Sequence, residues 1–129
     1  MRTESRPARP IALRVAAWTL ALLLSVILFA VAWAWCWLGF EEEFSEEGKA
    51  QAAGTTMAGW GLQFGLIPVL VLHALVLIGL FLAIRGGRRG VGLSLLIALG
   101  ILVAASLPGF VVVQVLSGGS MFEPPVYVP

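Results

Sequence analysis

Three long apolar runs constrain this chain more than any other feature of its sequence. The first covers 15–38 and contains no charged residue, and the second and third cover 60–84 and 91–116. Each is longer than the roughly 18 residues that a helix needs to cross the hydrocarbon core of a bilayer. The sequence therefore predicts an all-α integral membrane protein with three transmembrane helices.

The composition argues against a water-soluble fold. The chain has 129 residues, of which 60% are hydrophobic and 12% are charged, whereas a soluble domain is roughly half apolar and a quarter charged. A soluble fold of this size cannot hide so much apolar surface from water. Transmembrane strands are about 10 residues long and alternate in polarity, which these runs do not. Helices are therefore expected, because they satisfy every backbone polar group within one segment.

The connecting segments define the rest of the organisation. Residues 85–90 read Arg-Gly-Gly-Arg-Arg-Gly, a short basic turn that we expect to join the second and third helices as an antiparallel hairpin. Residues 39–59 are expected to form an acidic loop with five glutamates. The chain begins with a basic segment, 1–14, and ends with a proline-rich tail, 117–129.

Positive charge is distributed unevenly between the two sides of such a protein. Lys49 is the basic residue on the side of the acidic loop and the tail. The other side collects seven arginines, Arg2, Arg6, Arg9, Arg14, Arg85, Arg88 and Arg89. Basic flanks stay in the cytoplasm. We therefore expect a plasma-membrane protein with a cytoplasmic amino terminus and an extracytoplasmic carboxyl terminus, with topology anchors at Arg14, Arg85, Arg88 and Arg89.

Two further features concern origin and the membrane surface. Arginine outnumbers lysine seven to one and asparagine is missing, which favours a GC-rich bacterial genome because lysine and asparagine codons are AT-rich. Indole rings favour the boundary between lipid and water. We expect four of them at the extracytoplasmic interface, namely Trp33, Trp35, Trp37 and Trp60.

The first apolar run has a second interpretation as a signal peptide. It follows a basic segment and contains two small-x-small patterns, so that cleavage after Ala32 or Ala34 would leave a protein with two helices. However, the run is longer than the apolar region of a signal peptide, which has about 7–15 residues. Its apolar character also continues to Leu38. Both observations favour an uncleaved helix.

His73 is the single histidine and lies near the middle of the second helix. Ionisable groups at that depth are costly and often functional, for example in proton relays. The competing interpretation is a structural hydrogen bond between helices, with Ser94 or Ser106 of the third helix as partner. The sequence leaves both interpretations open.

Two prolines interrupt the later helices, Pro68 in the second and Pro108 in the third. Proline removes a backbone donor and kinks a helix. Such breaks expose carbonyl groups to ions in some transporters, but membrane helices also tolerate them as simple kinks because neighbouring groups satisfy the backbone again. We favour the kink.

Small residues indicate where helices approach closely. In a membrane, close approach is the main way in which helices gain packing energy over contact with lipid. The second helix carries a small-xxx-small step, and four small residues fall on one face of the third helix. The predicted packing positions are Gly61, Gly65, Ser94, Ala98, Ala105 and Gly109.

The sequence offers little for catalysis. With one histidine, one cysteine and no aspartate, it predicts no catalytic triad, no metal or iron–sulfur cluster and no intramolecular disulfide. No catalytic, cofactor-binding or metal-ligating residue and no nucleic-acid partner are expected.

We predict a non-enzymatic accessory or interaction subunit, in a homo-oligomer or a larger complex in the lipid bilayer. The alternative is a protomer of an oligomeric channel or transporter that uses His73 and the helices kinked at Pro68 and Pro108.

Overall fold

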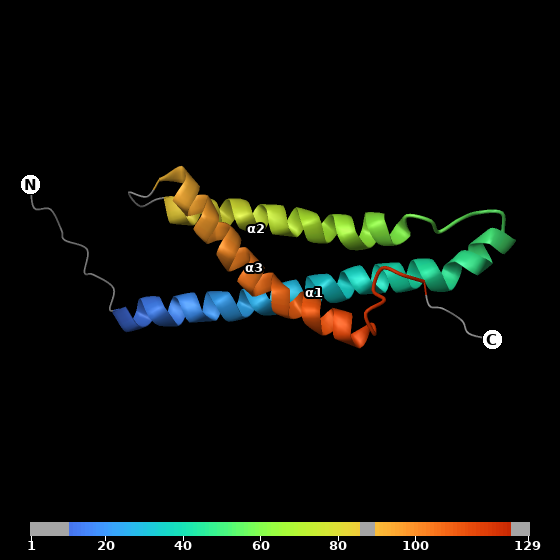
Figure 1. Ribbon diagram of the computed structural model, residues 1–129, viewed down its shortest axis with the longest axis horizontal. Helices are drawn as coiled ribbons and strands as arrows, with labels where there is room; N and C mark the ends of the chain where they lie inside the picture. The colour runs from blue at the N-terminus through green and yellow to red at the C-terminus, as the bar shows by residue number, and fades with distance from the viewer. Residues whose placement is uncertain (1–10, 86–89, 125–129) are drawn as a thin grey trace, which may run out of the picture.

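A computed structural model describes residues 11–85 and 90–124, and all regular structure in these residues is helical (Figure 1). The elements in chain order are α1 (Ile11–Ala52), the π-helical segment η1 (Gly61–Leu66), α2 (Ile67–Arg85) and α3 (Val91–Leu116). The helix α1, the unit made by η1 with α2, and α3 are each long and apolar enough to cross a membrane. The predicted all-α fold with three spans is confirmed.

Helix α1 continues far beyond the apolar run that predicted it. It has 42 residues, and at about 1.5 Å per residue it is about 63 Å long, roughly twice the thickness of a bilayer core. The expected acidic loop, 39–59, differs accordingly: it is helical as far as Ala52, and only residues 53–60 link α1 to η1. The residues after Leu38 include many glutamates and alanines, which are strong helix formers. The membrane span therefore ends where α1 leaves the lipid, but the helix itself continues.

The three spans differ in how they lie against one another. Helix α2 runs back alongside α1, and α3 returns from the far end of α2 and then crosses α1 diagonally (Figure 1). The predicted antiparallel hairpin of α2 and α3 is therefore present. Its turn, residues 86–89 with Arg88 and Arg89, lies outside the described residues, as does the amino-terminal segment 1–10.

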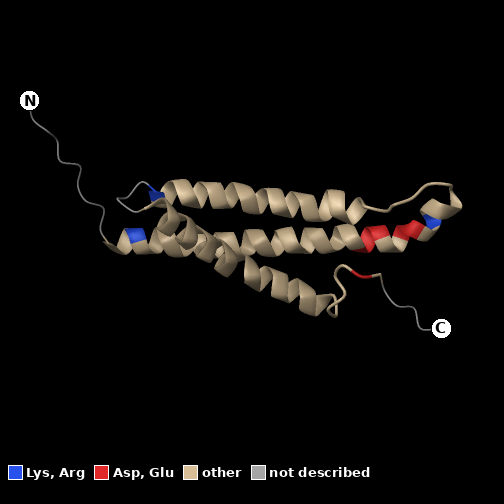
Figure 2. Ribbon diagram, turned by 45° about the horizontal axis from the view of Figure 1, so that its top comes forward, with Lys and Arg blue, Asp and Glu red and all other residues tan. Residues whose placement is uncertain are grey.

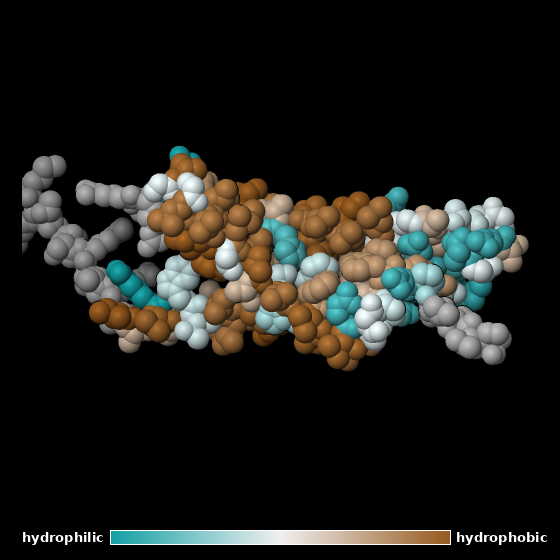
Figure 3. Space-filling view, viewed as in Figure 1, coloured by the Kyte–Doolittle hydropathy of each residue, from teal (hydrophilic) through white to brown (hydrophobic). Residues whose placement is uncertain are grey.

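The charged residues gather at opposite ends of the molecule. Arg14 near the start of α1 and Arg85 at the end of α2 lie at one end, which we call the basic end (Figure 2). Lys49 and the glutamates of 41–47 lie at the other, which we call the acidic end. Between them the surface is mostly hydrophobic, with a few polar patches (Figure 3). An apolar band between two charged ends is the surface expected of a membrane-spanning protein.

A thin core holds the helices together along one face of each. On α1 this face carries Phe29, Trp33, Cys36 and Phe40, at the i, i+4, i+7, i+11 spacing of a helical stripe. Phe29 and Cys36 are fully buried, and Cys36 packs in a cluster with Val69, Val113 and Met121. The contacts between helices therefore come from a few aligned positions, while most large apolar side chains face outward.

Candidate functional site

The predicted packing residues all lie buried at contacts between the helices. Gly61 and Gly65 are the buried residues of η1, and the buried face of α3 includes Ser94, Ala98, Ala105 and Gly109. On the same face the structure adds Leu102 and Val113, which the sequence did not single out, and Ser106, which it suggested only as a partner of His73. Together they form a continuous stripe along α3 that faces α1 and α2.

Close backbone approach explains why glycine occupies two of these positions. A Cβ atom added to Gly109 would lie 2.6 Å from the Cα of Ala30, so α3 crosses α1 nearly backbone to backbone at this point. A Cβ added to Gly65 would lie 2.9 Å from the carbonyl oxygen of Cys36. Both distances are shorter than van der Waals contact allows, and a larger residue would push α1 away from its neighbours.

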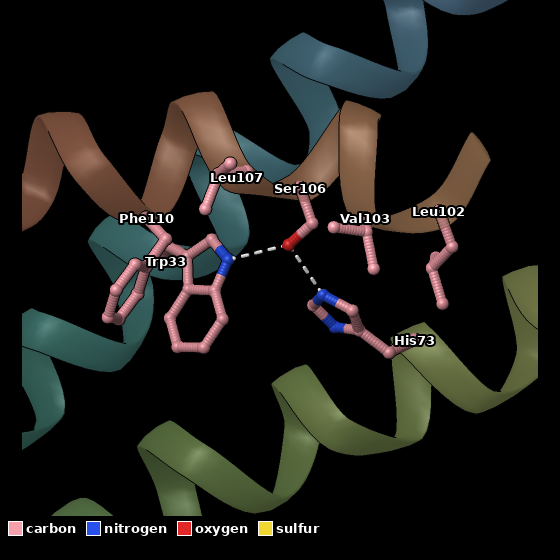
Figure 4. A pocket seen from close by; sticks show the side chains of 7 residues that line it. All are labelled: Trp33, His73, Leu102, Val103, Ser106, Leu107 and Phe110. Atoms are coloured by element: carbon pink, nitrogen blue, oxygen red, sulfur yellow. Dashed lines mark hydrogen bonds between the residues drawn. The ribbon is translucent and has the colours of Figure 1, made fainter. Parts of the chain in front are cut away.

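A chain of hydrogen bonds joins all three spans near His73 (Figure 4). The Nε1–H of Trp33 on α1 donates to the Oγ of Ser106 on α3 over 2.9 Å. The same Oγ lies 2.7 Å from Nε2 of His73 on α2, and Nδ1 of His73 lies 2.7 Å from the carbonyl oxygen of Val69. The interhelical bond from His73 to Ser106, one of the two partners that the sequence suggested, is therefore present.

The identities of these groups fix the direction of two of the three bonds, and for a neutral imidazole they fix the third as well. The Val69 carbonyl can only accept, so Nδ1 of His73 carries a hydrogen and donates it. In a neutral imidazole Nε2 is then an acceptor and takes the hydroxyl hydrogen of Ser106. Trp33 has a single donor and uses it on Ser106. A neutral His73 therefore satisfies every donor in the chain, as groups in a membrane interior require.

Aromatic packing surrounds the imidazole. The ring of Phe29 lies 4.5 Å from the His73 ring between centroids, and the Trp33 ring lies 5.7 Å away in an edge-on arrangement. Trp33 in turn meets Phe110 at 4.9 Å. Edge-to-face contacts of this kind stabilise aromatic pairs beyond the area that they bury. The three helices are thus held at this level by hydrogen bonds and by ring contacts together.

A cavity adjoins the hydrogen-bonded chain. Its volume is about 320 Å³, and its apolar wall comes from Leu102, Val103, Leu107 and Phe110 of α3. Trp33, His73 and Ser106 supply its few polar atoms (Figure 4). Ligand pockets in proteins begin at about this size and are lined in this way, by apolar walls with a few polar groups.

Trp33 is the member of this site that the sequence reasoning placed elsewhere. Its indole turns into the bundle toward Ser106 and Phe110 instead of facing the membrane surface. Trp33 lies four residues after Phe29 and three before Cys36 on one helical face. In a run as uniformly apolar as 15–38, however, that spacing does not show which face is buried. By contrast, Trp35 is 60% exposed on the outer side of α1.

Pro68 marks the junction between η1 and α2. It is the second residue of α2, and it has no N–H to donate to the carbonyl of Phe64 four residues earlier. The Nε1–H of Trp35 donates to that carbonyl oxygen over 2.8 Å. Here a side chain of α1 takes the place of the missing backbone donor. Pro108, the second predicted kink position, lies inside α3.

At the acidic end, two glutamates of α1 fasten the segment that follows it. The carboxylate of Glu43 accepts from the backbone N–H groups of Gly59 and Gly61 at 3.0 and 2.7 Å. The carboxylate of Glu47 accepts from the N–H of Met57 at 2.6 Å and from the Thr56 hydroxyl. We call residues 53–60 the strap.

The Glu47 carboxylate is held in its charged form. Hydrogen bonds from the Gln51 side chain, the Met57 backbone and the Thr56 hydroxyl, in that order of effect, lower the pKa of Glu47 below its ordinary value of 4.5. Donors that favour the ionised form act in this direction. The strap therefore depends on a charge that persists to lower pH than the charge of an ordinary glutamate.

No protein-family model, no curated protein and no solved structure matches the chain. Its site must therefore be interpreted from geometry alone. Among the described residues, no group of three or more histidine, cysteine or acidic side chains is placed to hold a metal ion. What the geometry shows is a set of polar groups that bond to one another across helices.

Proposed function

We propose that this chain is a membrane protein without enzymatic activity that acts by association, as an accessory or interaction subunit. The observation that carries the proposal is the helical projection at the acidic end. The 14 residues of α1 from Gly39 to Ala52 rise about 21 Å beyond the apolar run. The strap fastens this projection through Glu43 and Glu47, so it offers other molecules a surface of fixed shape.

One face of the projection points away from the strap. Its exposed residues follow the i, i+4, i+7, i+8, i+11 spacing of a helical face. We call it the outer face, and it consists of Glu41, Ser45, Gly48, Lys49 and Ala52. Both signs of charge and a hydroxyl occur on it, which suits a polar contact with the extramembrane part of a partner subunit.

The ionisable side chains support the same proposal. Both ring nitrogens of His73 and two of the glutamates in α1 are engaged in bonds within the chain. Such groups stabilise this fold instead of presenting themselves to a substrate. The remaining surface is an apolar band, which contacts lipid or other membrane helices.

The proposal places the protein in a bacterial plasma membrane with its basic end in the cytoplasm. The support is the excess of arginine in the sequence at that end, since basic flanks are retained on the cytoplasmic side. The projection and the carboxyl-terminal tail are then extracytoplasmic. A partner of the outer face would be a protein with a domain on that side of the membrane.

The test is site-specific photocrosslinking in cells that make the full chain. A photoreactive residue at Ser45 on the outer face is expected to give one discrete crosslinked product. The matched control carries the probe at Leu96, which is 69% exposed on the apolar surface of α3, and is expected to give no discrete protein product. A monomeric native mass together with no product from either position contradicts the proposal.

A second candidate function is a protomer of an oligomeric channel or transporter. The cavity of about 320 Å³ beside His73 favours it, since that cavity brings polar groups together within an apolar wall. It predicts pH-dependent flux in proteoliposomes that is lost in His73→Leu. Flux that is unaffected by this substitution excludes a role for His73 in transport.

A further inference from the structure

The first third of α1 has few contacts with the rest of the described residues. Every residue from Ile11 to Leu24 is exposed, and α1 diverges here from α2 and from the start of α3 (Figure 1). The gap forms an open groove with a volume of about 340 Å³. One wall is formed by α1 between Trp18 and Ser25, and the other by Leu80 of α2 and Ile101 of α3. We call it the wedge.

The wedge is apolar in effect, although two hydroxyl groups line it. The Thr19 hydroxyl donates to the carbonyl of Val15 over 3.0 Å, and the Ser25 hydroxyl donates to the carbonyl of Ala21 over 2.7 Å. Both hydroxyl hydrogens are thus used within α1. A water molecule needs two to four polar partners, so the wedge suits a hydrocarbon chain better than water or a polar ligand.

The basic end of the molecule provides a charge above the wedge on the same face of α1. Arg14 precedes Trp18 by four residues and Ser25 by eleven, so all three side chains lie on one helical stripe. From Arg14 to Ser25 the helix rises about 16 Å. That distance is close to half of a bilayer core about 30 Å thick. With Arg14 at the membrane surface, the wedge therefore lies within one leaflet and its inner end, at Ser25, lies near the middle of the bilayer.

From this arrangement we infer that the wedge binds one anionic phospholipid of the leaflet at the basic end. An acyl chain lies between α1 and the α2–α3 hairpin, and the phosphate meets the guanidinium of Arg14. Guanidinium and phosphate form paired, charge-assisted hydrogen bonds. The exposed indole of Trp18, 62% accessible, lies one turn below, at the depth that tryptophan favours.

A lipid explains why α1 can diverge from its neighbours. Two apolar walls separated by a gap lose their packing contacts unless another molecule fills the space. An acyl chain fills it and supports the first third of α1, which the other described residues leave exposed. The site is separate from the outer face at the acidic end, so it does not depend on the proposed association.

The test is native mass spectrometry of the full chain released from nanodiscs that contain equal amounts of phosphatidylglycerol and phosphatidylcholine with the same acyl chains. The wild type is expected to retain one phosphatidylglycerol. In Arg14→Gln the preference for phosphatidylglycerol is expected to fall about fivefold, since one basic charge near the membrane surface is worth about that much. The matched charge control, Lys49→Gln at the other end, is expected to keep the preference.

A second variant tests the cavity independently of charge. Ala21→Trp places a large side chain in the wedge and is expected to abolish retention of either lipid, whereas Leu82→Trp, on an exposed face of α2, is expected to leave retention unchanged. Circular dichroism confirms that each variant is helical. The inference is overturned if Ala21→Trp retains lipid like the wild type, if the wild type shows no preference between the two lipids, or if Ala21→Trp removes a second copy of the chain instead of a lipid.

Discussion

At the scale of single residues, Ser106 is the point at which all three spans meet. Its hydroxyl accepts from Trp33 of α1 and forms a hydrogen bond with Nε2 of His73 of α2. Ser94 lies on the same helix and is also buried, but its Oγ has no hydrogen-bond partner within the described part of the chain. Comparing substitutions at the two serines therefore distinguishes how much stability comes from a hydroxyl that forms hydrogen bonds and how much from one that only fills space.

Replacing Ser106 by alanine should destabilise the protein by about 1–2 kcal/mol, because it leaves the Trp33 N–H and the His73 Nε2 without a partner in a buried site. Ser94→Ala is the matched control and should change stability by less than about 0.5 kcal/mol. Both values can be measured by unfolding the purified protein in mixed micelles and following its helicity. Equal losses of stability in the two variants would show that the hydrogen bonds of Ser106 do not stabilise the protein.

The sequence allowed part of this site to be predicted. His73 was recognisable because a histidine deep in an apolar run needs a partner, and serines on the neighbouring helix were the available acceptors or donors. The role of Trp33 was not recognisable. Its residue type and depth suggest a tryptophan at the membrane interface, whereas the direction of its side chain depends on how α1 is rotated about its axis. In a run as uniformly apolar as 15–38 the pattern does not fix that rotation.

At the scale of elements, the crossing of α1 and α3 depends on the absence of a side chain. Gly109 lets its helix approach Ala30 so closely that no Cβ fits between them. Gly100, on the same helix, has nothing within 4 Å of its missing Cβ. Close approach, and not helix flexibility, is thus the reason for glycine at position 109.

Gly109→Ala should therefore destabilise the protein by about 1–3 kcal/mol, the usual effect of forcing extra volume into a packed contact. Gly100→Ala should be neutral or slightly stabilising, because alanine is the better helix former. The same unfolding measurement in micelles distinguishes them. A neutral Gly109→Ala would mean that α1 and α3 do not cross as tightly as described.

The helical projection at the acidic end is an element that the sequence alone did not predict. Its glutamates suggested a solvated loop, since charge marks the end of a membrane span. Glutamate and alanine are nevertheless good helix formers, and the strap provides tertiary contacts through Glu43 and Glu47. The position of these carboxylates on the strap side of α1 follows from the fold and not from local composition.

The strap should become less stable as the pH falls into the acid range. The pKa of Glu47 is lower in the folded protein than its ordinary value of 4.5, so its carboxylate stabilises the strap above that value. The stabilisation is lost as the pH falls from about 4.5 through the lower, folded pKa. A carbon-13 NMR titration of Glu47 in micelles should give a pKa below the ordinary value of 4.5.

Glu47→Gln tests the same bonds at neutral pH. The amide cannot accept as strongly from Met57 and Thr56, so amide hydrogen exchange at Met57 should become faster. Glu41→Gln is the control, because Glu41 lies on the outer face and its side chain contacts no part of the strap through a hydrogen bond within the described residues. Unchanged exchange at Met57 in Glu47→Gln would show that the backbone alone holds the strap.

At the scale of the whole molecule, the unequal distribution of positive charge predicts one orientation of the protein in the membrane. The structure shows which residues a labelling experiment can use to test that orientation. Cys36 is fully buried beneath the contact of α1 with its neighbours, so an impermeant maleimide should leave the folded protein unlabelled. A reporter must therefore be added at each end. Lys49 lies at an exposed position about 16 Å beyond Leu38, and Gly90 is exposed at the start of α3.

In a Cys36→Ala background, Lys49→Cys should react with an impermeant maleimide added to intact cells. Gly90→Cys should react only after the membrane is permeabilised, because the positive-inside rule places the basic end in the cytoplasm. The positions are informative together, since each serves as the control for the other. Labelling of Gly90→Cys alone in intact cells would reverse the proposed orientation, and it would move the inferred phospholipid beside Arg14 to the outer leaflet.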